Sequence, residues 1–222
     1  MNFFTYKDYI KSIHALRLNA VMQVAEKGEE YQLRAKEKLT KNTHEELVKT
    51  LLKDKKEIAK FINNFLDYNL KIKYYDLEEC NNKHIRKKFG YKDINIVYKL
   101  KKDNVFFFID YQSKIEPKMF LRIINYCINI IYEWSKGEKI KKEMRYPIVV
   151  PIVIYTGKES WKKQQDFEEI QAENYQYDNY KIRPKYNLID INKITNQRLL
   201  KEKSLFGYVM MLEKSKCEDR SK

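Results

Sequence analysis

An apolar run that ends in an isolated carboxylate is the feature of this sequence that most constrains its fold. Residues 106–109 read Phe-Phe-Phe-Ile and lead directly into Asp110, Tyr111 and Gln112. Side chains alternate along a strand, so the pattern predicts a buried strand on which Asp110 and Gln112 share one face. A carboxylate with a polar partner two residues later suits metal-dependent phosphodiester chemistry. The more common explanation of such residues is a surface-facing strand end.

The segments around this strand predict a mixed sheet flanked by helices. Residues 94–100 alternate in polarity and are joined to it by a polar connection at 101–104, which predicts a hairpin. Residues 147–155 are almost all apolar, as in a strand covered on both faces, although Pro151 is expected to delay regular pairing. The remaining expected elements are strands at 83–89 and 186–191 and helices at about 42–66, 119–134 and 192–203. This order predicts an α/β or α+β sandwich.

The helix expected at 119–134 has Pro117 at its entrance. It contains many apolar residues at helical spacing, which predicts one buried face. The expected buried stripe consists of Leu121, Ile124, Cys127, Ile128 and Ile131.

The chain divides into one main domain and two flanking segments. Residues 1–41 predict an N-terminal helical hairpin in which nothing suggests chemistry. Residues 42–216 contain the expected sheet and its helices. Residues 217–222 are expected to form a tail, for which a truncation scar is one explanation.

Composition makes a nucleic acid the first partner to consider. Lys and Arg number 45 against 31 Asp and Glu, which gives a formal net charge of +14 and a sequence pI near 9.4. Such a surface attracts polyanions. Two observations weaken this inference. A low-GC genome would also produce an excess of Lys, Asn, Ile and Tyr, and most of the basic residues are Lys, which binds phosphate less well than the bidentate guanidinium of Arg.

The cysteines and the apolar runs favour a cytoplasmic protein. Cys80, Cys127 and Cys217 are odd in number and far apart, so neither a disulfide framework nor a structural zinc site is expected. No apolar run approaches the roughly 20 residues that span a bilayer. Charged residues interrupt residues 1–11, where a signal peptide would be apolar. We therefore expect no membrane partner.

Several segments, in this order, carry a resemblance to a known family. They are His44–Lys49, Ile94–Lys99, Asp110–Ser113, Lys118–Tyr126 and Tyr146–Gly157 with Trp161. These segments resemble the motifs of the bacterial Rpn/YhgA-like branch of the PD-(D/E)XK nuclease superfamily, the recombination-promoting nucleases associated with transposases. The resemblance extends from about residue 42 to residue 214.

The resemblance implies a restriction-endonuclease-like fold and a DNA endonuclease that uses Mg²⁺ or Mn²⁺ and no small-molecule cofactor. It implies that Asp110 binds the metal, that Gln112 positions the attacking water, and that position 95 supplies the first catalytic acid. In the working enzyme, the ion lowers the pKa of the attacking water.

Three positions depart from the family pattern. Asn95 stands where the branch has Asp, Asp110 where it has Glu, and Glu45 where Asp is usual. Asn95 halves the anionic charge at the site, whereas hard divalent cations favour charged oxygens. Because Asp is one methylene shorter than Glu, the carboxylate oxygens of Asp110 lie about 1.5 Å short of the position that Glu would give them. A misplacement near 1 Å can lower the rate of catalysis about a hundredfold. Both changes predict an impaired site.

Two further carboxylates could supply the missing metal ligand. Asp93 lies two residues before Asn95, so it is expected on the same side of the strand. A solvated turn residue is the simpler explanation of Asp93. Glu45 could add a ligand from the first helix, and its place in the first helical turn is equally well explained by the helix dipole.

Four further residues are candidates for contacts with DNA or phosphate: His44, Lys49, Lys114 and Arg122. Helix capping explains His44 as well, and a solvated loop lysine is the more common explanation of Lys114. Arg122 is expected either to face the site or to form a structural ion pair.

Three hypotheses for function are consistent with these residues. The first is a metal-dependent DNA endonuclease associated with mobile elements and recombination, impaired by Asn95 and Asp110. The second is a catalytically inactive protein that binds DNA through a basic face, and the third is a truncated fragment. The oligomeric state is left open, with a homodimer among the options.

Overall fold

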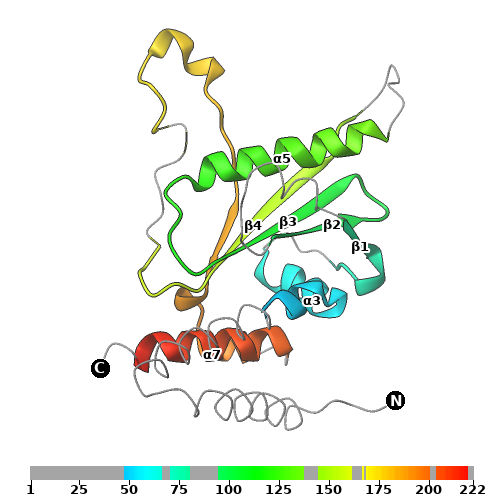
Figure 1. Cartoon of the computed structure of the whole chain (residues 1–222), viewed down its shortest axis with the longest axis vertical. Helices are drawn as coiled ribbons and strands as arrows, with labels where there is room; N and C mark the ends of the chain where they lie inside the picture. Colours follow the sequence, from blue (N-terminus) through cyan, green and yellow to red (C-terminus); the bar gives the residue numbers. More distant parts are fainter. Residues whose placement is uncertain are drawn as a thin grey trace, which may run out of the picture. The chain divides into compact units, whose positions relative to one another are not determined.

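The computed structural model describes residues 48–66, 71–80, 95–137, 145–161, 167, 169–200 and 204–219 (Figure 1). The chain forms two compact units, residues 1–49 and residues 50–222. The expected hairpin at 1–41 and the expected strand at 83–89 lie outside the described residues. The sheet and the helices packed on it belong to the second unit.

Five strands form one mixed sheet in the order β1-β2-β3-β4-β5. They are β1 (Leu77–Cys80), β2 (Asn95–Leu100), β3 (Val105–Gln112), β4 (Ile148–Tyr155) and β5 (Asn187–Asp190). The first three strands pair antiparallel, whereas β4 is parallel to both β3 and β5. The expected α/β sandwich is therefore confirmed, including the hairpin that joins β2 to β3.

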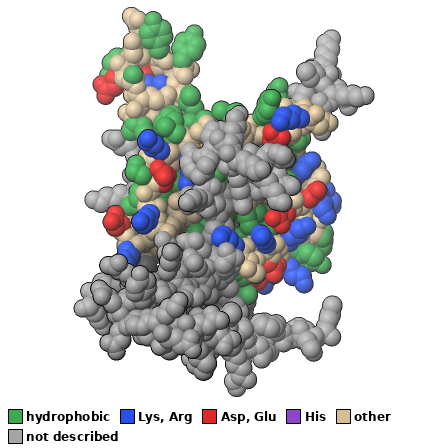
Figure 2. All heavy atoms as spheres, in the orientation of Figure 1, with side chains coloured by type: hydrophobic (Ala, Val, Ile, Leu, Met, Phe, Trp, Pro, Cys, Tyr) green, Lys and Arg blue, Asp and Glu red, His purple; other side chains and the backbone are tan. Residues whose placement is uncertain are grey.

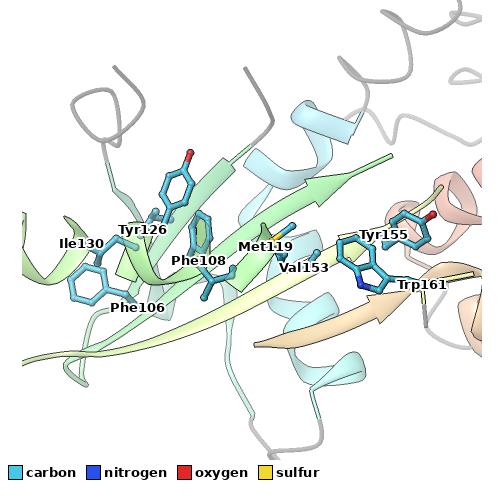
Figure 3. Packing of buried hydrophobic residues seen from close by; sticks show 10 residues of the cluster. Phe106, Phe108, Met119, Tyr126, Ile130, Val153, Tyr155 and Trp161 are labelled. Carbon is cyan, nitrogen blue, oxygen red and sulfur yellow. The ribbon is translucent and has the colours of Figure 1, made fainter. Parts of the chain in front are cut away.

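The helix α5 (Met119–Lys136) connects β3 to β4 and lies along one face of the sheet (Figure 1). A core cluster fills the space between them, as Figure 3 shows. Phe108 of β3 stacks on Tyr126 of α5 with ring centroids 4.4 Å apart. Tyr155 meets Trp161 edge to face at 4.8 Å. Such aromatic pairs contribute about 0.5–1.5 kcal/mol beyond their area burial.

The buried stripe expected on α5 was wrong. The buried residues of this helix are Met119, Phe120, Arg122, Ile123, Tyr126 and Ile130. Leu121 is 48 % exposed and Ile128 59 %, although both were expected in the core. Apolar residues lie on both the inner and the outer face of this helix, so periodicity alone could not select its inner face. Contacts with β3, through Arg122 and Tyr126, select it instead.

The other face of the sheet packs against helices from both ends of the unit. These are the helical residues 50–53, α3 (Lys55–Phe65) and α7 (Leu205–Asp219), with α6 (Asn196–Leu200) packed on α7. The short 3₁₀ helices are η1 (Tyr74–Asp76), η2 (Tyr175–Tyr180) and η3 (Ile191–Lys193), of which η2 lies in a segment that extends away from the sheet. The hydroxyl of Tyr98 on β2 donates to the backbone oxygen of Leu52 at 2.6 Å. Glu57 of α3 accepts a hydrogen bond from the backbone N–H of Phe206 at 2.9 Å, which ties α3 to α7.

The single helix expected at 42–66 is divided at Asp54. The Asp54 carboxylate accepts from the N–H groups of Lys56 and Glu57, so it caps a new helix, α3. The helix expected at 192–203 is likewise divided into η3 and α6. The Thr195 hydroxyl oxygen accepts a hydrogen bond from the backbone N–H of Arg198 and so caps the start of α6.

Three further expectations need correction. The strand β1 was missed, because its four residues include two acids and only Leu77 is fully buried. Pro151 does not delay pairing with β3, which begins at Ile148, although pairing with β5 begins only at Ile152. The helix α7 continues past residue 216 into the segment that was expected to be a tail.

Candidate active site

Asp110 lies near the end of β3, inside the protein. Its side chain is 0 % exposed, and that of Gln112 is 6 % exposed. The Gln112 Nε2 donates a hydrogen bond to Asp110 Oδ1 at 2.9 Å. The prediction that these two residues share one face of the strand is therefore confirmed. In the sheet, Asp110 pairs with Asn95 on one side and with Val153 on the other.

Arg122, from the first turn of α5, meets Asp110 at both carboxylate oxygens. Its Nη2 donates to Oδ1 at 3.2 Å, and its Nε lies 2.9 Å from Oδ2. The Nε contact is close but not aligned as a hydrogen bond. The side chains of the two residues are only 3 % and 0 % exposed, so solvent screens the ion pair little.

The link between β3 and α5 sets up this contact. The backbone oxygen of Glu116 accepts the N–H of Met119 at 3.1 Å, and its carboxylate accepts the N–H of Lys118 at 2.9 Å. This turn starts α5 seven residues after Gln112, so that its first turn overlies the end of β3. Met119 is 0 % exposed and anchors the turn in the core.

The residues that the structure describes at this site do not fit a divalent metal ion. A hard cation requires several oxygen ligands, with carboxylates supplying the charge. Among the described residues of this site, Asp110 is the one carboxylate, and the guanidinium of Arg122 already balances its charge. Within the described ranges, no group of three or more His, Cys, Asp or Glu residues gathers closely enough to hold a metal.

Comparison with known proteins identifies the family of this chain. The family model described as "Putative transposase, YhgA-like" matches residues 42–221. The chain belongs to this family. The YhgA-like family is PD-(D/E)XK nuclease-like, so a nuclease-related, transposase-associated function follows. Neither a search of curated proteins nor a search of solved structures gave a match. None of the helices in the described ranges has the length and apolar character that crossing a membrane requires.

The structure brings together only some of the residues that the YhgA-like resemblance singled out. Asp110, Gln112 and Arg122 are in contact, and Asn95 occupies the register position opposite Asp110. Lys114 is exposed in the turn after β3, and Lys49 is half-buried in the first compact unit. His44, Glu45 and Asp93 lie outside the described residues.

Another buried acid, Asp190, was missed by the sequence reasoning. It ends β5, is 4 % exposed, and shares a register row with Tyr155 and so with Gln112. Its Oδ1 accepts the N–H of Asn192 at 3.1 Å, and its Oδ2 lies 3.6 Å from Lys193 Nζ. Asp190 therefore caps η3. An acid at the end of the strand expected at 186–191 was the available signal.

The thiols in this part of the YhgA-like domain are poor nucleophiles. Burial raises the pKa of Cys127 to about 11, and burial also raises that of Cys80. Since the thiolate is the reactive form, both remain protonated near neutral pH. This agrees with a site built from Asp110 and its neighbours rather than from cysteine.

We predict strong energetic coupling between Asp110 and Arg122. Asp110→Asn and Arg122→Met should each lower the free energy of unfolding by about 3–5 kcal/mol, because each leaves one buried group without its partner. The double variant should lose clearly less than the sum. Urea denaturation of the four proteins measures this.

Lys136→Met is the matched control, because Lys136 pairs with Glu133 at 2.7 Å on the exposed end of the same helix. It should cost less than about 1 kcal/mol. Additive losses at Asp110 and Arg122, or losses as small as that of the control, would contradict the placement of this ion pair.

Proposed function

We propose that this YhgA-like protein binds DNA in the cytoplasm through its nuclease-like domain and does not cleave it in a metal-dependent reaction. The observation that carries the proposal is the state of Asp110. This carboxylate is fully buried, and each of its oxygens lies against a nitrogen of Arg122. Its lone pairs are thus already directed at a protein cation.

The charge at the site supports the loss of metal binding. Asp110 and Arg122 contribute one negative and one positive charge, and Asn95 and Gln112 contribute none. A divalent cation entering such a site would meet no excess of negative charge and would lie next to a guanidinium. An acid at position 95, as in the family pattern, would leave the site with one net negative charge.

The ion pair alone does not set this chain apart, because Arg122 matches an Arg of the family motif. What differs is the pair of acids around it. A Glu at position 110 would carry its carboxylate about 1.5 Å beyond the position of Asp110, and an Asp at position 95 would supply a second anionic ligand. Both features are lost here, which favours a non-cleaving protein over an impaired but working endonuclease.

DNA binding is supported by the charge of the chain and by one described surface. The chain carries a formal net charge of +14. Beside β1, Lys56 lies over the ring of Tyr74 at 5.3 Å, and Lys73 lies over that of Tyr75 at 5.6 Å. Both rings are about half exposed, and Figure 2 shows basic side chains on this side of the molecule. Cations interleaved with aromatic rings suit contacts with phosphates and bases.

We predict that the protein does not nick supercoiled plasmid in Mg²⁺ or Mn²⁺, whereas the Asn95→Asp/Asp110→Glu variant does. The two substitutions restore the family's acids, and a gain of about a hundredfold or more is expected, since a 1 Å misplacement costs about that much. The same double variant carrying Gln112→Ala is the control and should lose the gain. Cleavage by the unmodified chain that Asp110→Asn abolishes would contradict the proposal.

We predict metal-independent DNA binding that weakens steeply with salt. Fluorescence anisotropy should give the same affinity in EDTA and in Mg²⁺ at constant ionic strength, and the logarithm of affinity should fall linearly with that of the salt concentration. Lys56→Ala/Lys73→Ala should weaken binding and flatten the slope by about 2. Lys136→Ala is the matched control, since Lys136 also lies over a tyrosine ring but on α5. Salt-insensitive binding, or equal effects of the two variants, would contradict the proposal.

A further inference from the structure

A closed loop rich in exposed tyrosines precedes β5. Its base is fixed by Gln171, whose side chain donates to the backbone oxygen of Ile182 at 2.8 Å and accepts the N–H of Ile182 at 3.0 Å. Residues 171–182 are therefore a loop with its ends held together, and we call them the tyrosine arm. In Figure 1 the arm is the yellow-to-orange segment that extends away from the sheet. Compact loops of this kind are frequently functional.

The tyrosine arm is ordered by its own polar contacts. Asn174 caps η2 by accepting the N–H of Gln176 at 3.2 Å. Asp178 pairs with Lys181 at 2.9 Å, and its backbone oxygen accepts Arg183 Nη2 at 3.0 Å. The arm therefore holds its shape while its tyrosines point outward. Rings displayed in this way contribute contact area with little loss of conformational entropy on binding.

The apolar exposure of the arm is large. Tyr175 is 91 % exposed, Tyr180 82 % and Tyr177 58 %, and Ile182 at the base is 54 % exposed. Large apolar groups gathered on one surface segment are typical of interaction sites. In protein-binding loops, Tyr supplies rigid contact area and Asn supplies adaptable hydrogen bonds.

A second apolar surface lies on α5, on the face that was expected to be buried. Leu121, Ile128 and Tyr132 are 48 %, 59 % and 57 % exposed and follow one another at spacings of seven and four residues. These spacings place them in one row along the helix. We call them the α5 stripe. Of the charged residues of α5, Arg122 is buried against Asp110, and Glu133 pairs with Lys136, whose Nζ lies 4.8 Å from the centre of the Tyr132 ring.

Charge makes these two surfaces poor sites for DNA. Residues 169–185, which contain the arm, carry three acids and three bases, namely Glu169, Glu173, Asp178, Lys181, Arg183 and Lys185. The three residues of the α5 stripe are uncharged, and Lys136, which lies over the Tyr132 ring, is paired with Glu133, so the stripe has no net charge. A polyanion is attracted by net positive charge, which neither surface offers. Depletion of charge with enrichment in aromatic residues is instead the composition of protein interfaces.

The net charge of the chain sets where a second copy can bind. Each chain carries a formal net charge of +14, so two copies repel one another over most of their surfaces. They can approach where both surfaces are neutral, and the arm and the stripe satisfy this condition. Because both surfaces are present on every copy, two copies can make the same contact twice around a two-fold axis.

We propose that two copies of this chain form a two-fold dimer in which the tyrosine arm of each copy packs on the α5 stripe of the other. Burying about 150–250 Å² for each tyrosine removes on the order of 1,000 Å² from the two arms together. The stripes beneath them add a comparable area, so the contact reaches the range of about 1,200–2,000 Å² typical of specific interfaces. The dimer does not depend on whether the domain binds or cleaves DNA.

The test measures the mass of the full chain by sedimentation equilibrium. The unmodified protein should be dimeric at micromolar concentration. The arm variant Tyr175→Ser/Tyr177→Ser/Tyr180→Ser and the stripe variant Leu121→Gln/Ile128→Gln/Tyr132→Gln should each weaken association by about a hundredfold or more, since several interface residues are lost. Tyr74→Ser/Tyr75→Ser is the matched control and should leave the dimer unchanged. Circular dichroism verifies that all variants fold.

Mixing the arm variant with the stripe variant distinguishes the proposed contact from others. The mixture should form a heterodimer, because one arm of one partner and one stripe of the other remain intact, although each variant alone is monomeric. Association should also strengthen with added salt, which screens repulsion between copies, whereas salt weakens DNA binding.

Three results would overturn the proposal. The first is an unmodified chain that stays monomeric up to about 100 µM, a concentration that corresponds to less than about 6 kcal/mol of association free energy. The second is a dimer that the arm variant leaves intact. The third is a mixture of the two variants that gives no heterodimer, which would mean that arms pair with arms or that another protein covers them.

Discussion

The contact between a buried carboxylate and a buried guanidinium joins the end of β3 to the first turn of α5. Asp110 and Arg122 are both at most 3 % exposed, and neither charge is stable in the interior without the other. The pair therefore fixes how far α5 is displaced along the sheet and how it is rotated about its own axis. Gln112 completes the arrangement with a hydrogen bond to the same carboxylate. At the position where the family resemblance implies a metal ligand, the structure has a buried ion pair.

The rotation of α5 links the interior of the domain to its surface. With Arg122 turned to β3, Tyr126 one turn later stacks on Phe108, and Ile130 follows into the core. Leu121, Ile128 and Tyr132 are then left on the outer face. A helix with apolar residues on two sides thus serves two purposes, since one side joins the core and the other forms the exposed α5 stripe. The proposed dimer follows from this orientation, whereas the proposed loss of cleavage follows from the changed acids at positions 95 and 110.

The sequence predicted the elements near the site better than it predicted their packing. Alternation along β3 was enough to place Asp110 and Gln112 together, and the apolar run at 147–155 was enough to place β4 in the sheet. It was not enough to orient α5, because the deciding residue, Arg122, is a charged residue that hydrophobic periodicity assigns to solvent. The break at Asp54 was missed for a related reason, since a local cap overrides a continuous apolar pattern. The strand β1 is short and carries acids, so it resembles a loop in composition.

A crystal structure of the protein grown in Mn²⁺, with an anomalous difference map, tests the central claim most directly. The map locates the ion itself and requires no substitution that could disturb folding. The account predicts that Arg122 remains on Asp110 and that no anomalous peak lies within coordinating distance of this carboxylate. A peak bound to Asp110, with the Arg122 guanidinium displaced from it, would contradict the account and restore the site to a metal-dependent nuclease.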